Sequence, residues 1–170
     1  FIRPEPHVVD VTVHVQPVHF GSLFGGNLIG LQVLADALSQ GGLASAVTSD
    51  IGKDLWAKMF YNCSLNALGA VLQVPYGHLG ESENSRGLIA GIVEEVFQVM
   101  QGLGHHSHWQ TAKDYLKEFY NHLLPSTYDH ESSMLQDIRA GRRTEIESLN
   151  GVIVREGKKL KINVHCNETV

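Results

Sequence analysis

The stretch IGKDLWAKMFYNCSLNALGAVL, residues 51–72, decides the fold. Its apolar side chains cover a helix almost all the way round, which is typical of a helix inside a core or at a domain interface. No convincing strand follows Val47. Further helical patterns occur over residues 85–103, 109–124, 131–140 and 144–161. In the last pattern Thr144 and Glu147 have the spacing of a capping box. The sequence therefore predicts an all-helical domain over residues 49–170.

A short α/β segment precedes this domain. Residues 8–16, VVDVTVHVQ, alternate apolar and polar side chains with the period of a strand that is buried on one face. A short apolar run over residues 18–23, leucines at helical spacing and the run ASAV at residues 44–47 follow it. We expect strands plus one helix over residues 1–48, and a mainly α fold for the chain.

Composition excludes several classes of protein. Of the 170 residues, 43% are hydrophobic and 18% charged, so the chain can bury a core and is not a disordered tail. A net charge of −5 does not suit a general nucleic-acid binder. No apolar run approaches the roughly 20 residues that a membrane span needs. Two distant cysteines, Cys63 and Cys166, exclude a disulfide scaffold and a zinc ribbon, and they suit a reducing cytoplasm.

The first candidate site lies on the helix over residues 51–72. Lys58, Asn62 and Asn66 are spaced four apart, which puts them on one side of that helix. Buried amides and an ammonium group need partners, since an unsatisfied neutral polar group costs roughly 2–7 kcal/mol. They either line a polar cleft, or Lys58 reaches outward while the amides hold a neighbouring loop.

The second candidate site is SSMLQDIRAGRRTEIESLNG, residues 132–151. Ser132 and Ser133 stand where a helix would begin, which suits either an anion site or an ordinary N-cap. Glu145 stands at the expected start of the final helix, where the helix dipole favours a carboxylate. Three nearby arginines could bind an anion or form a solvated face: Arg139, Arg142 and Arg143.

The histidines give only a weak metal hypothesis. His105, His106 and His108 follow a helix end in a glycine-flanked segment, with no Asp, Glu or Cys close by in sequence to complete a set. This tract is more typical of an exposed loop. We therefore expect no metal site.

The two candidate sites together resemble a known family. DLWAKMFYNCSLNALGAV (54–71) and SSMLQDIRAGRRTEIESLNGVIVREGKKL (132–160) are similar to two blocks of the ketopantoate reductase (2-dehydropantoate 2-reductase) family. The resemblance covers most of the chain from about residue 21 onward. It implies a helical domain of the 6-phosphogluconate dehydrogenase C-terminal type, preceded by a remnant of a Rossmann-type NADPH domain.

The resemblance also implies roles for five residues. Lys58 matches the catalytic lysine that protonates the ketone oxygen as hydride arrives from NADPH. Asn62 and Asn66 match substrate-positioning asparagines, and Ser133 matches the serine that holds the substrate carboxylate. Glu145 matches the glutamate that partners the lysine and the substrate.

The chain departs from the family pattern in three respects. Tyr76 replaces a family asparagine, and His130 replaces another polar residue, so a different 2-oxo acid is an alternative substrate. The Gly-x-Gly-x-x-Gly turn of the family is missing. From this absence, and from its start at Phe1, we expect the chain to be a fragment that neither binds NADPH well nor turns over alone.

The resulting hypothesis is the substrate-binding and catalytic half of an NADPH-dependent 2-oxo-acid reductase. The expected reaction is ketopantoate to pantoate in pantothenate and coenzyme A synthesis, in a cytoplasmic homodimer that binds no nucleic acid or membrane. The alternatives are a non-enzymatic helical interaction module and, more weakly, a metal-binding protein that uses the histidine tract.

Overall fold

The computed structural model describes residues 2–10 and 16–170. The chain divides into two compact units, Phe1–Ile51 and Gly52–Val170. The division falls three residues beyond the expected boundary after residue 48. The helical second unit confirms the mainly α fold.

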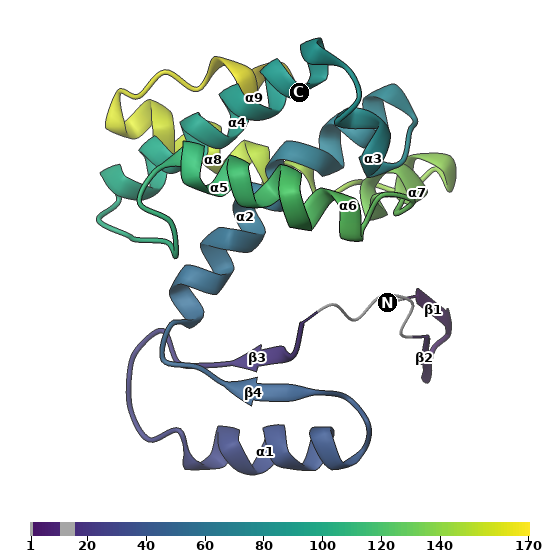
Figure 1. The fold of residues 1–170 in the computed structure, drawn as a ribbon, viewed down its shortest axis with the longest axis vertical. Coiled ribbons are helices and arrows are strands. Elements are labelled where there is room, and N and C mark those ends of the chain that lie inside the picture. The colour runs from purple at the N-terminus through teal and green to yellow at the C-terminus, as the bar shows by residue number, and fades with distance from the viewer. Residues whose placement is uncertain (1, 11–15) are drawn as a thin grey trace. The chain divides into compact units, whose positions relative to one another are not determined.

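The first unit is a small α/β structure (Figure 1). β1 (Ile2–Glu5) pairs antiparallel with β2 (Val8–Asp10). β3 (Val18–Phe20) pairs parallel with β4 (Ser45–Val47), and α1 (Ile29–Gln40) connects them. A parallel pair needs such a crossover, which explains the helix between the two strands. Of the strand expected over residues 8–16, the part over residues 11–15 lies outside the described residues.

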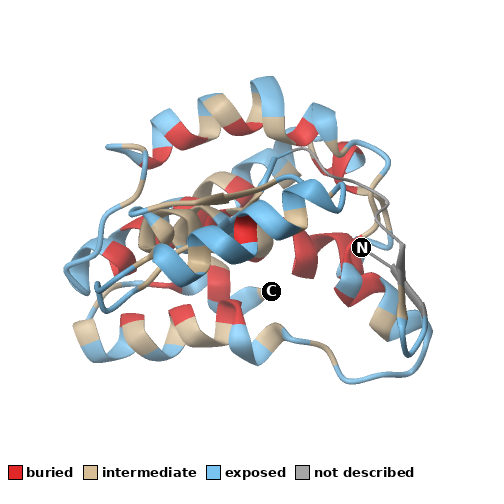
Figure 2. Ribbon diagram, turned by 90° about the horizontal axis from the view of Figure 1, so that it is seen from below, coloured by how far each residue is buried: buried red, intermediate tan, exposed pale blue. Residues whose placement is uncertain are grey.

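The second unit consists of helices. Their bounds are α2 Ile51–Leu72, α3 Tyr76–Leu79, α4 Glu83–Gly102, α5 Ala112–Glu118, α6 Leu124–Ser126, α7 Ser133–Arg139, α8 Asn150–Leu160 and α9 His165–Thr169. None of the helices in the described part of the chain combines the length and apolar character that a bilayer span needs. Buried and exposed segments alternate along these helices, as amphipathic packing requires (Figure 2).

The centre of the second unit is the C-terminal two-thirds of α2. Nine of its 22 residues are buried, all between Phe60 and Ala70. The Phe60 ring stacks on Phe97 of α4, with the ring centroids 4.4 Å apart and the planes nearly parallel. Tyr115 of α5 packs against the same Phe60 ring at 5.2 Å. The predicted all-round burial of α2 is therefore correct for this part of the helix.

Two details of the predicted helices are wrong. The third helix does not stop before Pro125, because a π-helical turn over Phe119–Leu123 leads into α6, which contains that proline. The final helix does not begin at Thr144 with a capping box. Instead a 3₁₀ turn, Ile146–Ser148, comes first, and Glu147 accepts a hydrogen bond from Arg155 (3.2 Å) rather than capping a helix.

Candidate functional site

The first three predicted site residues share one side of α2, but their surroundings differ. Lys58 is exposed, Asn62 is half-buried and Asn66 is buried. Among the described residues, the side chains of Lys58 and Asn62 have no hydrogen-bond or ion-pair partner. Lys58 therefore reaches outward within this unit, as one of the two readings of the sequence expected. The Lys58 ammonium group and the Asn62 amide both remain available to a ligand.

Asn66 is held by a residue that the sequence marked only as a departure from the family. The Tyr76 hydroxyl donates a hydrogen bond to Asn66 Oδ1 at 2.5 Å. Burial raises the pKa of Tyr76, so this phenol is a donor at neutral pH. His130 packs beside Tyr76, with the ring centroids 5.2 Å apart, and burial lowers the pKa of His130. The two residues that depart from the family pattern, Tyr76 and His130, are thus in contact with each other.

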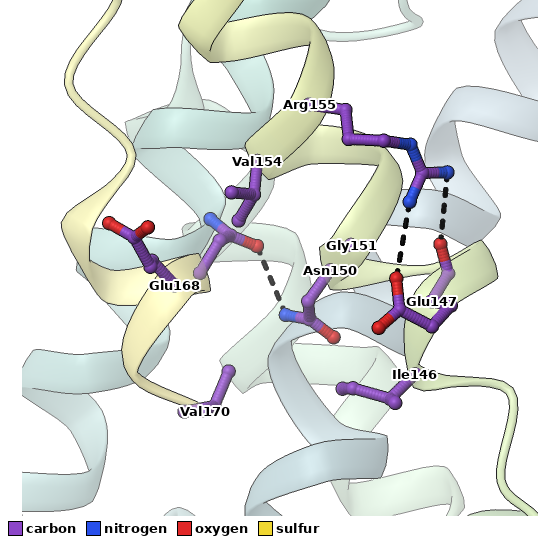
Figure 3. A pocket seen from close by; sticks show the side chains of 9 residues that line it. Ile146, Glu147, Asn150, Gly151, Val154, Arg155, Glu168 and Val170 are labelled. Carbon is purple, nitrogen blue, oxygen red and sulfur yellow. Dashed lines mark hydrogen bonds and ion pairs between the residues drawn. The ribbon is translucent and has the colours of Figure 1, made fainter.

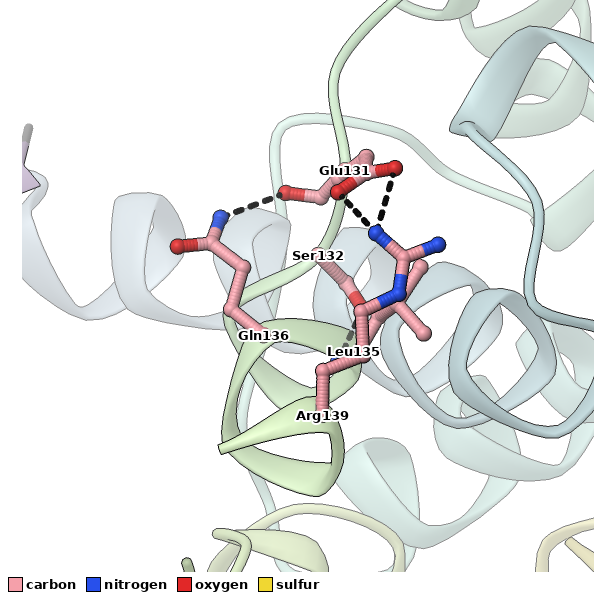
Figure 4. Close-up of polar contacts among 5 residues, drawn as sticks. All are labelled: Glu131, Ser132, Leu135, Gln136 and Arg139. Atoms are coloured by element: carbon pink, nitrogen blue, oxygen red, sulfur yellow. Dashed lines mark hydrogen bonds and ion pairs between the residues drawn. The ribbon is translucent and has the colours of Figure 1, made fainter. Parts of the chain in front are cut away.

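Of the two neighbouring serines, Ser132 takes the N-cap role that the sequence offered as one reading (Figure 4). Ser132 is fully buried and caps α7, because its Oγ accepts a hydrogen bond from the Leu135 N–H at 3.0 Å. The same Oγ donates to the backbone oxygen of Asn66 at 3.3 Å. Ser133, the first residue of α7, is exposed. The capping serine therefore ties the start of α7 to Asn66 and leaves Ser133 open to a ligand.

Glu145 is exposed and stands directly before the 3₁₀ turn that precedes α8. Its side chain caps no helix and forms no ion pair with any described residue. The expected pairing of Glu145 with Lys58 is therefore absent within the part of the chain that the structure describes. The role of Glu145 stays a prediction.

The arginines near these serines serve as a charged surface. Arg139 pairs with Glu131 at 2.7 Å, and Arg142 pairs with Asp137 at 2.8 Å. Figure 4 shows the first of these pairs over the start of α7. The two arginine side chains are 50% and 62% exposed, so solvent screens both pairs and each contributes about 0–1 kcal/mol to stability.

The histidine tract does not gather metal ligands. His108 Nε2 lies 2.5 Å from Asp54 Oδ1, and the His105 ring packs against Trp56. Within residues 2–10 and 16–170, no group of three or more His, Cys, Asp or Glu side chains is placed to hold a metal ion. Asp54 is the acidic neighbour that sequence spacing alone did not reveal.

A hollow of about 280 Å³ lies elsewhere in the helical unit (Figure 3). Its lining includes Glu147, Asn150, Arg155 and Glu168, and none of the five predicted site residues. Asn150 Nδ2 donates to the Cys63 oxygen and to Asn167 Oδ1, both at 3.0 Å. These bonds link α8 to α2 and α9, so the sequence analysis missed a structural polar contact here.

Comparison with known proteins supports the resemblance to the ketopantoate reductase family over most of the chain. The family described as ketopantoate reductase PanE/ApbA, C terminal, matches residues 50–170. The 2-dehydropantoate 2-reductase of Aquifex aeolicus is 39% identical over 140 residues, which cover 82% of this chain and 45% of that protein. The corresponding enzyme of Salmonella typhimurium is 33% identical over 153 residues, with 89% and 46% covered. The chain thus spans somewhat under half the length of these curated relatives.

Solved structures are similar over the same span. A PanE/ApbA family ketopantoate reductase from Ralstonia eutropha superposes with a TM-score of 0.73 at 28% identity, covering 92% of this chain and 50% of that one. A D-mandelate dehydrogenase in a ternary structure with NADH and anilino(oxo)acetate gives a TM-score of 0.78 at 27% identity, covering 89% and 48%.

Proposed function

Because the chain belongs to the ketopantoate reductase PanE/ApbA family, we propose that it is the substrate-binding and catalytic half of a 2-oxo-acid reductase. The proposed reaction is the reduction of ketopantoate to pantoate by a nicotinamide cofactor. The observation that carries the proposal is the arrangement along α2. An exposed lysine and two asparagines share one face, and the buried asparagine is bonded to the start of α7 beside Ser133.

The chemistry of these residues suits the substrate. Reduction of a ketone to an alcohol requires a proton at the carbonyl oxygen, and the ammonium group of Lys58 supplies one. The Ser133 hydroxyl donates a hydrogen bond to the carboxylate, while Asn62 and Asn66 fix the orientation of the ketone. Glu145 is the carboxylate that partners the lysine and the substrate in this proposal, and water re-protonates the lysine after turnover. Lys58, Ser133 and Glu145 are exposed, so a substrate can reach them.

The residues present do not fit the phosphates of a dinucleotide. A dinucleotide-binding turn joins a strand to a helix through Gly-x-Gly-x-x-Gly. The glycines of the connection from β3 to α1, at positions 21, 25 and 26, do not have this spacing, and the first N–H of α1 already donates to Asn27 Oδ1 at 2.9 Å. This connection therefore lacks the spacing of a dinucleotide-phosphate turn. NADPH use, a cytoplasmic location, a homodimer and a place in pantothenate and coenzyme A synthesis remain proposals for the whole protein.

The test is steady-state turnover of the whole protein. NADPH and NADH oxidation is measured with ketopantoate, with its analogue that lacks the terminal hydroxyl, and with a phenyl-substituted 2-oxo acid. We expect turnover with ketopantoate. A folded protein that binds the cofactor but reduces none of these acids would contradict the proposal and favour the non-enzymatic interaction module.

A second candidate is a reductase of another 2-oxo acid. It is favoured by the aromatic pair of Tyr76 and His130, which replaces a family asparagine and another polar residue. The likeness to D-mandelate dehydrogenase is consistent with this candidate. Higher kcat/KM for the phenyl-substituted acid than for ketopantoate would select it.

A further inference from the structure

Tyr76 and Asn66 form a buried hydrogen-bonded pair. Each side chain is 4% exposed, and the Tyr76 hydroxyl donates to Asn66 Oδ1 at 2.5 Å. Leaving the buried Asn66 amide without this partner would lower the stability of the protein by about 1–3 kcal/mol, the desolvation penalty of an unsatisfied polar group. The pair links the middle of α2 to the first residue of α3.

Packing fixes the Tyr76 ring from several sides. The His130 ring lies at 5.2 Å, and the Tyr61 ring meets it edge-on at 5.7 Å. The Tyr76 backbone N–H donates to the His130 oxygen at 3.0 Å. A Cβ at Gly69 would lie in ordinary van der Waals contact with the same ring, 3.9 Å from Tyr76 Cδ1. The hydroxyl therefore has a defined position.

The backbone of Asn66 is held independently. The Ser132 Oγ donates to the Asn66 oxygen at 3.3 Å, and that serine is anchored as the cap of α7. Asn66 is thus restrained at its carbonyl by Ser132 and at its side chain by Tyr76. A side-chain amide that is bonded at Oδ1 and attached to a restrained backbone presents its Nδ2 in a single direction.

We infer that Tyr76 is a positioning residue that turns Asn66 into a hydrogen-bond donor toward the substrate. With Oδ1 engaged by the phenol, Nδ2 is the atom left to bind a ligand. It has no hydrogen-bond partner among the described residues. Asn66 therefore binds the 2-oxo acid through an acceptor oxygen of the substrate. The inference rests on the proposed function of the α2 face.

The test compares two tyrosine variants of the whole protein. Tyr76→Phe removes the hydroxyl that orients Asn66. Tyr61→Phe is the matched control, because the Tyr61 hydroxyl also has one side-chain partner, Thr127 Oγ1, and forms no hydrogen bond with Asn66. We expect Tyr76→Phe to raise KM for the 2-oxo acid about 3- to 10-fold, the value of one neutral hydrogen bond, with kcat within about 2-fold. Tyr61→Phe should change neither constant beyond about 2-fold.

Two results would overturn the inference. One is an unchanged KM in Tyr76→Phe, and the other is an equal rise in both variants, which would indicate a general packing effect. In the Asn66→Ala background, Tyr76→Phe should add nothing, because the two residues act as a unit.

A readout without turnover separates this inference from the proposed function. The Asn66 side-chain NH₂ signals in ¹H–¹⁵N spectra should shift with Tyr76→Phe and stay in place with Tyr61→Phe. If the whole protein reduces no 2-oxo acid but these signals shift as expected, the proposed function fails and the positioning contact stands. If they do not shift, the positioning contact fails.

Discussion

Lys58 and Asn66 lie eight residues apart on one side of α2, about 12 Å along the helix axis, yet their surroundings are opposite. Lys58 is exposed and has no partner among the described residues, whereas Asn66 is buried and bonded through both its backbone and its side chain. A proton donor must reach the substrate, and an orienting group must not move. In the function proposed above, this difference gives chemistry to the exposed end of the helix, at Lys58, and positioning to the buried end, at Asn66.

The largest expected effect tests whether the buried end anchors α2. Phe60→Ala removes a ring that is fully buried and stacked on Phe97, and should lower the free energy of unfolding by about 3–5 kcal/mol. Leu55→Ala, at a position that is 45% exposed on the same helix, should cost less than about 1 kcal/mol. Urea unfolding of the whole protein, followed by circular dichroism, measures both. Similar losses in the two variants would remove the distinction between the two ends.

A smaller effect tests the link between α7 and Asn66. Ser132→Ala removes the cap and should destabilise the protein by about 1–2 kcal/mol while raising KM for the 2-oxo acid. The matched control is Thr111→Ala, because Thr111 caps α5 by accepting from the Asp114 N–H at 3.1 Å. Its loss of stability should be similar and its KM unchanged. Equal KM values for the two variants would show that the hydrogen bond from Ser132 to Asn66 has no effect on substrate binding.

The smallest effect at neutral pH concerns Cys63, the first residue of the continuously buried stretch of α2 that ends at Ala70. Burial raises the pKa of Cys63 to about 12, so its thiol stays protonated and should resist iodoacetamide at pH 8.5 in the folded protein. The unfolded thiol ionises near its ordinary value of about 9. The stabilisation that this difference provides is therefore complete below pH 9 and lost as the pH rises toward 12.

Peptide mapping by mass spectrometry measures the labelling of both cysteines. Burial also raises the pKa of Cys166, but this side chain is only partly buried, so it should react faster than Cys63. Faster labelling of Cys63 would place the exposed part of α2 further along the helix than the structure does.

Much of the fold follows from local patterns in the sequence. The all-round apolar stretch predicted α2 with its correct bounds, and the pattern over residues 85–103 lies within two residues of α4. Short elements escaped, among them α3 and α9, because four or five residues carry no periodicity. The start of the final helix was predicted too early, because the spacing of Thr144 and Glu147 indicated a capping box. In the structure Glu147 pairs with Arg155 instead, which this spacing does not reveal.

The candidate site was predictable in its residue types and not in its connections. Helical spacing placed Lys58, Asn62 and Asn66 together, since they share one element. The bond from Ser132 to Asn66 joins residues 66 positions apart, and the Tyr76 contact depends on where α3 begins. Such contacts arise from tertiary packing, so sequence showed Tyr76 as a departure without showing what it binds.

The most direct test of the account is the kcat of Lys58→Ala in the whole protein, with the exposed Lys117→Ala as the matched control. Loss of a positioned general acid should lower kcat about 10²- to 10⁴-fold, with the melting temperature unchanged because Lys58 has no partner among the described residues. Lys117→Ala should turn over like the unmodified protein. A Lys58→Ala variant that keeps its kcat would contradict the assignment of chemistry to the exposed end of α2.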